Sequence, residues 1–313
     1  MPPEAESECC ILVKTAPEIS LKTHYVRRYF MGKLAKNMKA AFRAKGLSGN
    51  RMVKGRGRIF LYAPEAKAKK LAKVLPYIFG IHSFALAEAH KTTELNEIAD
   101  FVVVFARKLI KQNNTFAIRG RVAAEKKYSS KDLEIALGSA VLESLKEKKP
   151  KVNLSNPKRE IFVEVQGRET FVYAWQEKGA GGLPLGCEGT VAVLFEGKKD
   201  EALAAFLVMR RGCNVFPLVK SKTAKVLANI KKLVPWNSWR KFKPTPMREL
   251  GVLVSKPDIS AKALVLADAK PRKQALSRGM PGKFDAKVPL LYPLAFYPKE
   301  LKNEKMRAIA GGA

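Results

Sequence analysis

A turn between a predicted strand and a predicted helix has the position of a phosphate-binding loop. The apolar residues 190–195 predict a buried strand, Glu196-Gly-Lys-Lys-Asp-Glu201 follows it, and residues 202–211 predict a helix. Many nucleotide-binding domains begin with a strand, a turn and a helix in this order. Such a turn holds phosphate through free backbone N–H groups, away from other anions. The glutamates at its two ends would repel a triphosphate, whereas Lys198 and Lys199 would offset part of that repulsion, which leaves weak nucleotide binding open.

A second group of residues, at and after the end of another predicted strand, could neutralise the phosphates of a nucleic acid. Residues 115–119 alternate in polarity as a strand does, and a basic segment follows them. Guanidinium and ammonium groups neutralise phosphates, and a hydroxyl can bond to the sugar–phosphate backbone. The candidate RNA-binding residues of this segment are Arg119, Arg121, Lys126, Lys127 and Ser129. Taken by themselves, these residues are more typical of a solvated, charged hairpin.

Two further groups are candidates for contact with RNA, and each also has a structural explanation. Lys22, Arg27 and Arg28 are candidate RNA-binding residues, but a charged helix face explains them equally well. Trp236 and Trp239 are followed by several Lys and Arg residues and could stack on unpaired bases. Packing in a core explains one or both tryptophans at least as well.

Few residues of the chain are suited to binding a metal. The four cysteines include no Cys-x-x-Cys pair and there are only three histidines, so no metal site is predicted. The adjacent Cys9 and Cys10 could be redox-active, but two small residues in a buried strand are the better explanation. Glu196, Asp200 and Glu201 could hold a divalent ion. Carboxylates at a helix N-terminus also stabilise the helix, and this is the interpretation we favour.

The composition predicts a folded protein with a polyanionic partner. The 313 residues carry a formal net charge of +31, and 47% of them are hydrophobic. This apolar fraction suffices for packed cores, and the length suits two or three domains. A polyanion would neutralise the surplus of positive charge, so nucleic acid is the expected partner. No apolar stretch approaches the ~20 residues that span a bilayer. Residues 1–8 are acidic and proline-rich, unlike a secretory signal. We therefore expect no membrane partner and a cytoplasmic location.

Hydrophobic periodicity predicts a chain of alternating strands and helices. Phe30, Leu34 and Met38 belong to a repeat of four residues, which predicts an amphipathic helix over residues 25–44. Ser130 is expected to cap a helix over residues 131–146. Further helices are expected over residues 64–75 and 93–112, and further strands over residues 10–14, 58–62, 161–165, 170–174, 214–219 and 263–267, with one more inside 79–87. The glycine- and proline-rich residues 179–186 predict a domain boundary.

Several of these segments, in their order, match one protein family. They are Glu18-Ile-Ser-Leu-Lys22, Val26-Arg-Arg-Tyr-Phe30, Tyr77-Ile-Phe-Gly-Ile-His-Ser-Phe84, Thr115-Phe-Ala-Ile-Arg-Gly-Arg121, Tyr128-Ser-Ser130, Gly179-Ala-Gly-Gly-Leu-Pro-Leu-Gly186 and Val208-Met-Arg-Arg-Gly212. The chain resembles the tRNA 4-thiouridine synthetases in their archaeal-type form. The resemblance covers essentially the whole chain and is stronger before residue 218 than after it. Order and spacing carry it together, because no single motif is decisive.

The resemblance implies three domains and a division of labour among them. A ferredoxin-like domain over residues 1–63 and a THUMP domain over residues 64–178 would hold the acceptor end of tRNA. A reduced, Rossmann-like PP-loop domain over residues 179–313 would adenylate a uridine with ATP, before a persulfidic cysteine delivers sulfur. The fold class is therefore expected to be a combination of α/β and α+β domains.

The third domain departs from the pattern of this family. The family's phosphate loop is Ser-Gly-Gly-x-Asp-Ser, of which Gly197 and Asp200 remain here, while Lys198 replaces the second glycine. These three residues are a candidate remnant of a nucleotide site. The family's reactive thiol lies downstream of the loop, yet no cysteine follows Cys213. We therefore expect a pseudoenzyme with no catalytic residue assigned, and ATP as a cofactor only if the altered loop still binds it.

Several functional alternatives stay open at this point. The favoured hypothesis is a protein that binds tRNA or another structured RNA and presents it to a separate catalytic subunit for modification. A second is an active ATP-dependent tRNA sulfurtransferase that receives its sulfur from elsewhere. A third is a structural protein associated with RNA or the ribosome.

Overall fold

The computed structural model describes residues 8–123, 128–237, 242–249, 261–267, 289–295 and 297–310. The chain forms two compact units, which are described separately. The first unit comprises Met1–Lys14, Gly49–Lys73 and Ser83–Lys178. The second unit comprises Thr15–Ser48, Val74–His82 and Gly179–Ala313.

The N-terminal strands have the order of a ferredoxin-like domain. These strands are β1 (Glu8–Thr15), β2 (Arg51–Gly55), β3 (Arg58–Pro64) and β4 (Ile81–His90). They lie in the sheet in the order β2-β3-β1-β4, and β3 is antiparallel to both β1 and β2. A helix follows β1 and another follows β3 in the chain, namely α2 (His24–Ala44) and α3 (Glu65–Ala72). The expected boundary after residue 63 falls at the end of β3, ahead of α3 and β4 of the same β-α-β-β-α-β order.

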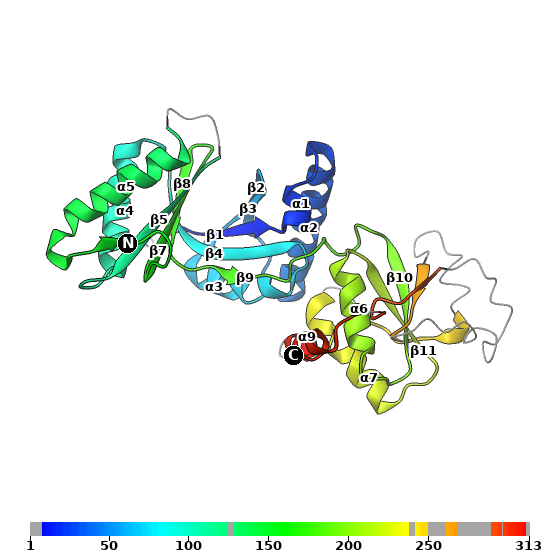
Figure 1. Ribbon diagram of the computed structural model, residues 1–313. Helices are drawn as coiled ribbons and strands as arrows, with labels where there is room; N and C mark the ends of the chain where they lie inside the picture. The colour runs from blue at the N-terminus through cyan, green and yellow to red at the C-terminus, as the bar shows by residue number, and fades with distance from the viewer. Residues whose placement is uncertain are drawn as a thin grey trace. The chain divides into compact units, whose positions relative to one another are not determined.

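The same sheet continues into the expected THUMP region (Figure 1). Its elements are α4 (Leu95–Leu109), β5 (Thr115–Val122), α5 (Ser130–Ser144), β6 (Lys151–Val152), β7 (Arg159–Gln166), β8 (Glu169–Tyr173) and β9 (Glu177–Lys178). The strand order is β4-β8-β7-β5-β6, with β5 parallel to β7 and β7 antiparallel to β8. The predicted hairpin across Gly167 is confirmed. Apolar residues of α4 and α5, such as Val102 and Leu137, pack in one core with Ile161 and Val163 of β7.

In the second unit, α2 has the apolar face that its sequence predicts. Phe30, Leu34, Met38 and Phe42 are all buried, as their spacing of four residues requires. The short helices α1 (Pro17–Ser20) and η1 (Leu75–Tyr77) belong to the same unit. The Asn37 side chain donates a hydrogen bond of 3.0 Å to the carbonyl oxygen of Leu185, so α2 is also joined to the segment that precedes the C-terminal sheet.

The remainder of the second unit is a parallel, Rossmann-like sheet with helices. Its elements are β10 (Thr190–Phe195), α6 (Glu201–Arg210), β11 (Asn214–Val219), α7 (Ala224–Lys231), η3 (Val234–Asn237), β12 (Thr245–Pro246), η4 (Met247–Glu249), β13 (Ala261–Val265), β14 (Leu290–Leu291) and α9 (Lys299–Ala310). The strand order is β12-β11-β10-β13-β14, and every pair is parallel.

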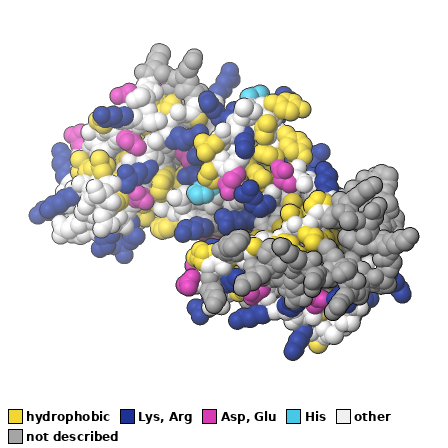
Figure 2. Space-filling view, turned by 45° about the vertical axis from the view of Figure 1, so that its right-hand side comes forward, with side chains coloured by type: hydrophobic (Ala, Val, Ile, Leu, Met, Phe, Trp, Pro, Cys, Tyr) yellow, Lys and Arg dark blue, Asp and Glu magenta, His cyan; other side chains and the backbone are white. Residues whose placement is uncertain are grey.

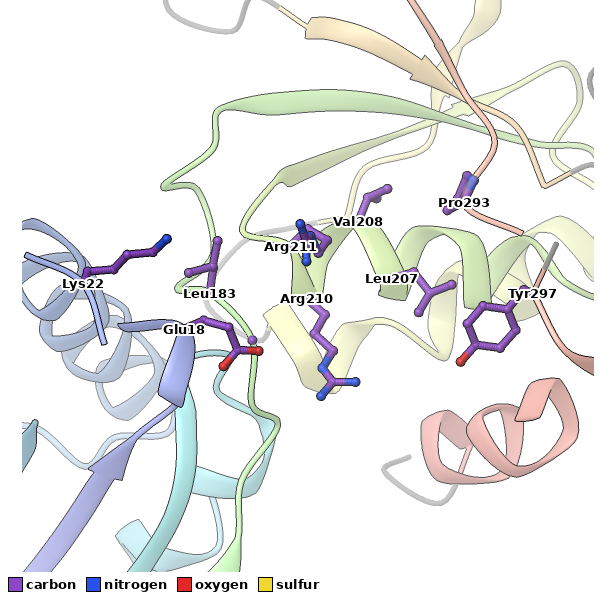
Figure 3. Close-up of a pocket in the computed structure, with 10 residues that line it drawn as sticks. Glu18, Lys22, Leu183, Leu207, Val208, Arg210, Arg211, Pro293 and Tyr297 are labelled. Carbon is purple, nitrogen blue, oxygen red and sulfur yellow. The ribbon is translucent and has the colours of Figure 1, made fainter. Parts of the chain in front are cut away.

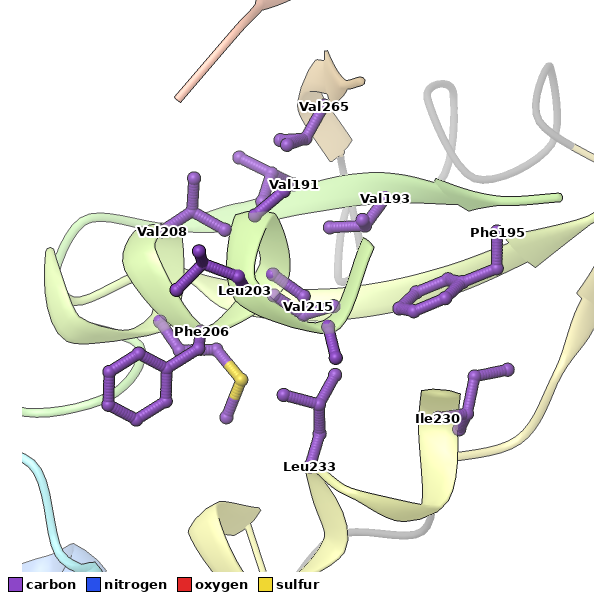
Figure 4. Close-up of a cluster of buried hydrophobic side chains, with 14 of the residues drawn as sticks. Val191, Val193, Phe195, Leu203, Phe206, Val208, Val215, Ile230, Leu233 and Val265 are labelled. Carbon is purple, nitrogen blue, oxygen red and sulfur yellow. The ribbon is translucent and has the colours of Figure 1, made fainter. Parts of the chain in front are cut away.

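The central strand β10 is buried on both faces. Val193 and Phe195 pack in a core with residues of α6, including Leu203 (Figure 4). The alternate residues Ala192 and Leu194 pack in a second core on the other face. Burial on both faces explains why the strand is apolar without alternation, and it fixes the turn between β10 and α6 at one edge of the sheet.

Candidate nucleic-acid interface and nucleotide loop

Arg119 lies on β5, and groups close to it in space hold its side chain. Its Nε donates a hydrogen bond of 2.8 Å to the carboxylate of Glu160, and its Nη2 donates one of 2.7 Å to the carbonyl oxygen of Leu154. The side chain keeps 35% of its surface exposed. One carboxylate therefore neutralises the guanidinium group, and only part of it remains accessible to RNA.

Arg121 belongs to a buried group of charges that we call the Glu164 cluster. The Glu164 side chain is 4% exposed and lies 2.8 Å from Arg58, 3.2 Å from Arg121 and 3.4 Å from Lys14. The hydroxyl of Tyr173 donates a further hydrogen bond of 2.8 Å to the same carboxylate. Three cations thus surround one anion, which leaves a local surplus of two positive charges in the first unit.

The pKa values in the Glu164 cluster follow from its geometry. Burial would raise the pKa of Glu164, but Arg58 and Lys14 outweigh burial and lower the pKa below its usual value. Burial and the adjacent Glu164 carboxylate raise the pKa of Tyr173, so the phenol stays a hydrogen-bond donor. Burial lowers the pKa of Lys14, although Glu164 opposes that change. The cluster is therefore an ionic core with excess positive charge.

Ser129 has a structural role that the sequence interpretation missed. Its hydroxyl accepts a hydrogen bond of 3.2 Å from the backbone N–H of Asp132, and its own N–H donates one of 2.8 Å to the Asp132 carboxylate. This reciprocal pair is a capping box. The prediction that Ser130 caps the helix is wrong, because the Ser130 hydroxyl accepts instead from the N–H of Val122 at 2.9 Å. Lys126 and Lys127 lie outside the described residues.

Lys22, Arg27 and Arg28 lie in the second unit, apart from the candidates of β5. Nη1 of Arg27 lies 3.4 Å from the carbonyl oxygens of both Ser20 and Lys22, so this side chain bonds to the turn before its own helix. The side chains of Lys22 and Arg28 are exposed. The structure thus divides the sequence-predicted RNA residues between two units.

Trp175 is a candidate contact that the sequence interpretation did not include. It follows β8 and is 68% exposed, and with Lys158 and Arg159 it lines a cavity of 210 Å³. The Nε of Arg159 is buried and has no hydrogen-bond partner among the described residues. An exposed indole beside two cations is suited to stacking on a base and binding its phosphate. The sequence signal was an aromatic residue at the end of a predicted strand, with basic residues at the start of its hairpin partner.

The structure places Trp236 in a core, which is one of the two explanations that the sequence left open. Trp236 is 8% exposed and belongs to the core of the second unit. Its ring contacts Phe206 edge-on, with the ring centroids 4.8 Å apart, and it lies near Phe79 and Tyr77 as well. The apolar environment explains the burial of the ring, whereas the buried indole Nε1 has no hydrogen-bond partner among the described residues. Trp239 lies outside the described residues.

The nucleotide loop between β10 and α6 holds a carboxylate of the chain itself. Glu201, the first residue of α6, is 1% exposed. Its carboxylate accepts hydrogen bonds from the backbone N–H groups of Glu196 and Gly197, at 2.5 and 3.0 Å, and from the side-chain amide of Asn229 at 3.1 Å. Gly197 has a φ of +91°, a conformation that glycine adopts readily. Two backbone donors at the start of the loop are therefore satisfied from within the protein.

Ion pairs engage the other charged groups of the loop. The Glu196 carboxylate lies 2.7 Å from the ammonium of Lys198 and 2.6 Å from that of Lys220. Burial would raise the pKa of Glu196, but the two lysines outweigh it and lower the pKa. Asp200 lies 3.4 Å from Lys302 of α9. Lys198 and Asp200, two candidate remnants of the nucleotide site, thus pair with residues of the protein.

No thiol in the described residues has the environment of a reactive nucleophile. All four cysteines are free. Burial and the neighbouring Glu188 raise the pKa of Cys187 to about 12 and also raise that of Cys213, so both side chains stay protonated thiols at neutral pH. Burial also raises the pKa of Cys9. The described residues contain no group of three or more His, Cys, Asp or Glu side chains that could hold a metal ion.

Comparisons with known proteins agree with the fold and its order of elements. The ThiI ferredoxin-like domain family matches residues 10–85, and the THUMP domain family matches residues 92–174. A probable tRNA sulfurtransferase of Methanosarcina mazei is 34% identical over 248 residues, which cover 76% of this chain and 60% of the relative. The chain belongs to the ThiI-type tRNA sulfurtransferase family. A second family member, from Sulfurisphaera tokodaii, is also 34% identical, over 74% of this chain and 61% of its own length.

Solved structures of similar fold cover almost the whole chain. The PH1313 protein of Pyrococcus horikoshii gives a TM-score of 0.77 at 23% identity, covering 96% of this chain and 99% of that protein. A 4-thiouridine synthetase, solved in complex with RNA and bound ATP, gives a TM-score of 0.67 at 19% identity, over 96% of this chain and 84% of that one. The chain spans about three fifths of the curated tRNA sulfurtransferases named above.

The surface agrees with the composition of the sequence. Lys and Arg side chains outnumber Asp and Glu side chains among the described residues visible in Figure 2. None of the helices in the described parts of the chain is long and apolar enough to cross a lipid bilayer.

Proposed function

We propose that this chain is a tRNA-binding member of the tRNA sulfurtransferase family that does not adenylate RNA by itself. Its THUMP match, its net charge of +31 and its fold similarity to a synthetase solved with RNA support the binding role. Two features of the first unit support this role. The surplus positive charge of the Glu164 cluster supports contact with phosphates, and the cavity lined by Trp175 supports contact with bases.

One observation carries the second half of the proposal, namely the position of the Glu201 carboxylate. It accepts hydrogen bonds from two backbone N–H groups of the loop that could otherwise bind a phosphate, and its side chain is 1% exposed. Each hydrogen bond to a charged group contributes about 1.5–3 kcal/mol, and a displaced carboxylate would repel the incoming phosphates. ATP bound in the usual way at this loop would have to break several such bonds.

The neighbouring charges support the same conclusion. Lys198 and Lys220 both pair with Glu196, so two lysines close to the loop are held by a second carboxylate. Catalysis of adenylation needs positive groups directed at the phosphates. The proposed role is therefore presentation of tRNA to a separate catalytic subunit. Within the same proposal, the ribosome is the alternative binding partner.

Two measurements on the full chain test the two halves. Filter binding should give tighter binding of tRNA than of duplex DNA of matched charge. Equal affinities and equal salt slopes would contradict the tRNA role, because they would indicate phosphate contact alone. Incubation with ATP and tRNA should release no pyrophosphate. Release that depends on tRNA would contradict the pseudoenzyme half and favour an active sulfurtransferase.

A further inference from the structure

The second unit contains a cavity at the end of α6 that is remote from the nucleotide loop. The cavity has a volume of 490 Å³. The loop precedes the first residue of α6, whereas the cavity lies at the last turn. Ten helical residues separate the two positions, which corresponds to about 15 Å. Figure 3 shows the side chains that line this Arg210 cavity, which include Glu18, Lys22, Leu183, Arg210, Arg211 and Tyr297.

The charge of the Arg210 cavity is positive. Lys22, Arg210 and Arg211 contribute three cations against the single carboxylate of Glu18. Within the part of the chain that the structure describes, none of the three cations takes part in an ion pair. Basic residues in the last turn of a helix are stabilised by the helix dipole, which accounts for Arg210. The dipole of α6 does not account for Lys22, which lies two residues after the end of α1.

The backbone holds the arginines at the cavity. The N–H of Leu183 donates a hydrogen bond of 2.9 Å to the carbonyl oxygen of Arg210. Gly182 has a φ of +70°, and a Cβ at this position would clash with that same carbonyl oxygen. Glycine therefore lets the segment lie directly against the last turn of α6. The main chain of Arg210 is consequently held against the segment that contains Leu183.

The rest of the lining is apolar and aromatic. Leu183, Leu207 and Val208 contribute aliphatic surface, and Pro293 and Tyr297 contribute ring surface (Figure 3). A simple anion would leave this surface without a contact. A nucleotide has both a phosphate for the cations and a flat base for the rings, and the volume lies within the usual range of small-molecule sites, about 300–1,000 Å³.

We propose that the Arg210 cavity binds a phosphate-bearing nucleotide. Lys22 and Arg211 contact the phosphate, and Tyr297 contacts the base. The ligand is either a free nucleotide or one unit of a single-stranded RNA, and both sources offer the same chemistry. This site differs from the loop between β10 and α6 and would be present even though Glu201 occupies that loop.

Titration calorimetry of the full chain tests the site, with AMP and an adenylate pentanucleotide as separate probes. The variants Lys22→Ala and Arg211→Ala should each bind about 10-fold more weakly, since each removes a hydrogen bond to a charged group. Arg248→Ala is the matched control, because it removes an exposed cation elsewhere in the second unit and should leave binding unchanged. Glu18→Gln should tighten binding by about 2- to 5-fold, because it removes a nearby exposed negative charge.

The outcomes separate the ligand sources and can overturn the proposal. Binding of AMP identifies a free-nucleotide site, and binding of the pentanucleotide alone identifies an RNA site. Four outcomes would overturn the proposal: no heat with either probe, inorganic phosphate binding as tightly as AMP, equal losses in the Arg248→Ala control, or losses in Lys199→Ala of the nucleotide loop with none in the cavity variants. Thermal melts confirm that each variant is folded. Pyrophosphate release measures the loop separately and does not depend on the cavity.

Discussion

Each of the two units contains a buried carboxylate, and different kinds of groups bind the two carboxylates. Glu164 in the first unit is surrounded by Lys14, Arg58 and Arg121. Glu201 in the second unit is held by two backbone N–H groups and the Asn229 amide. The first arrangement leaves positive charge in excess, whereas the second occupies three uncharged donors near the loop and leaves a negative charge in place.

This difference is the physical basis of the proposal that one unit is suited to a polyanion and that the loop of the other does not bind phosphate. A surplus of cations around one carboxylate raises the local potential, which attracts phosphates over several ångströms. A cradle of N–H groups acts only at contact distance and is lost once an internal acceptor fills it. Net charge alone therefore does not predict where a phosphate binds.

The largest expected effect is on the stability of the first unit. Glu164→Ala would leave Lys14, Arg58 and Arg121 without their shared anion, and breaking a buried ion pair in this way costs about 3–5 kcal/mol. Urea unfolding should show this loss. Glu160→Ala removes an ion pair that is 39% exposed on the carboxylate side and should cost less than about 1 kcal/mol. Equal losses in the two variants would mean that Glu164 is not an ionic core.

Low pH should reduce the contribution of the Glu164 cluster to folding stability. The folded-state pKa of Glu164 is lowered from 4.5, so its contribution to stability is fully present above the unfolded pKa. That contribution is lost as the pH falls through the lower, folded-state pKa. Unfolding measured between neutral pH and acid should therefore depend less steeply on pH in Glu164→Gln than in the wild type. If the free energy of unfolding had the same pH dependence in Glu164→Gln and in the wild type, the acid sensitivity would come from other carboxylates.

Trp175→Ala tests whether the first unit also contacts the bases of tRNA. Loss of a base–aromatic stack should weaken tRNA binding by about 1–3 kcal/mol, roughly 5- to 150-fold. The indole is 68% exposed, so the melting temperature should change little. Leu154→Ala, at a residue that is 62% exposed in the same unit, is the control. An unchanged affinity of Trp175→Ala, measured by filter binding, would remove Trp175 from the interface.

Glu201→Ser tests whether the Glu201 carboxylate of the second unit fills an anion site. The variant leaves three donors with a shorter partner and should lose about 1–3 kcal/mol of stability. Phosphate should restore part of that loss by binding the freed donors. Thermal melts in phosphate and in chloride of equal ionic strength measure this gain, with Asp200→Ser as the control for general salt effects. The same phosphate gain in both variants would mean that Glu201 does not fill an anion site.

The smallest effect is expected at Ser129. Ser129→Ala removes the capping hydrogen bond of α5 and should lower the free energy of unfolding by about 1 kcal/mol. Binding of tRNA should stay unchanged if the hydroxyl serves only as the cap. A weaker tRNA complex with unchanged salt slope would restore the direct RNA role that its sequence position first indicated.

Much of the fold could be predicted because local patterns report burial directly. The four-residue spacing of Phe30, Leu34 and Met38 predicts the buried face of α2, and the apolar run of β10 predicts a strand covered on both faces. The strand β2 was missed, since Arg51–Gly55 is mostly exposed and has no alternation of buried residues. The helices α7 and α9 were not assigned from the sequence either.

The sequence by itself determined the family, the excess of positive charge, and a phosphate loop that carries glutamates. Only the tertiary structure decided what those glutamates do, because the position of Glu201 depends on Asn229, which lies 28 residues away in the chain. The structure likewise decided that Trp236 is buried and Trp175 exposed. Periodicity reports whether a residue faces a core, whereas the partner of a charged or aromatic side chain depends on segments that only the fold brings together.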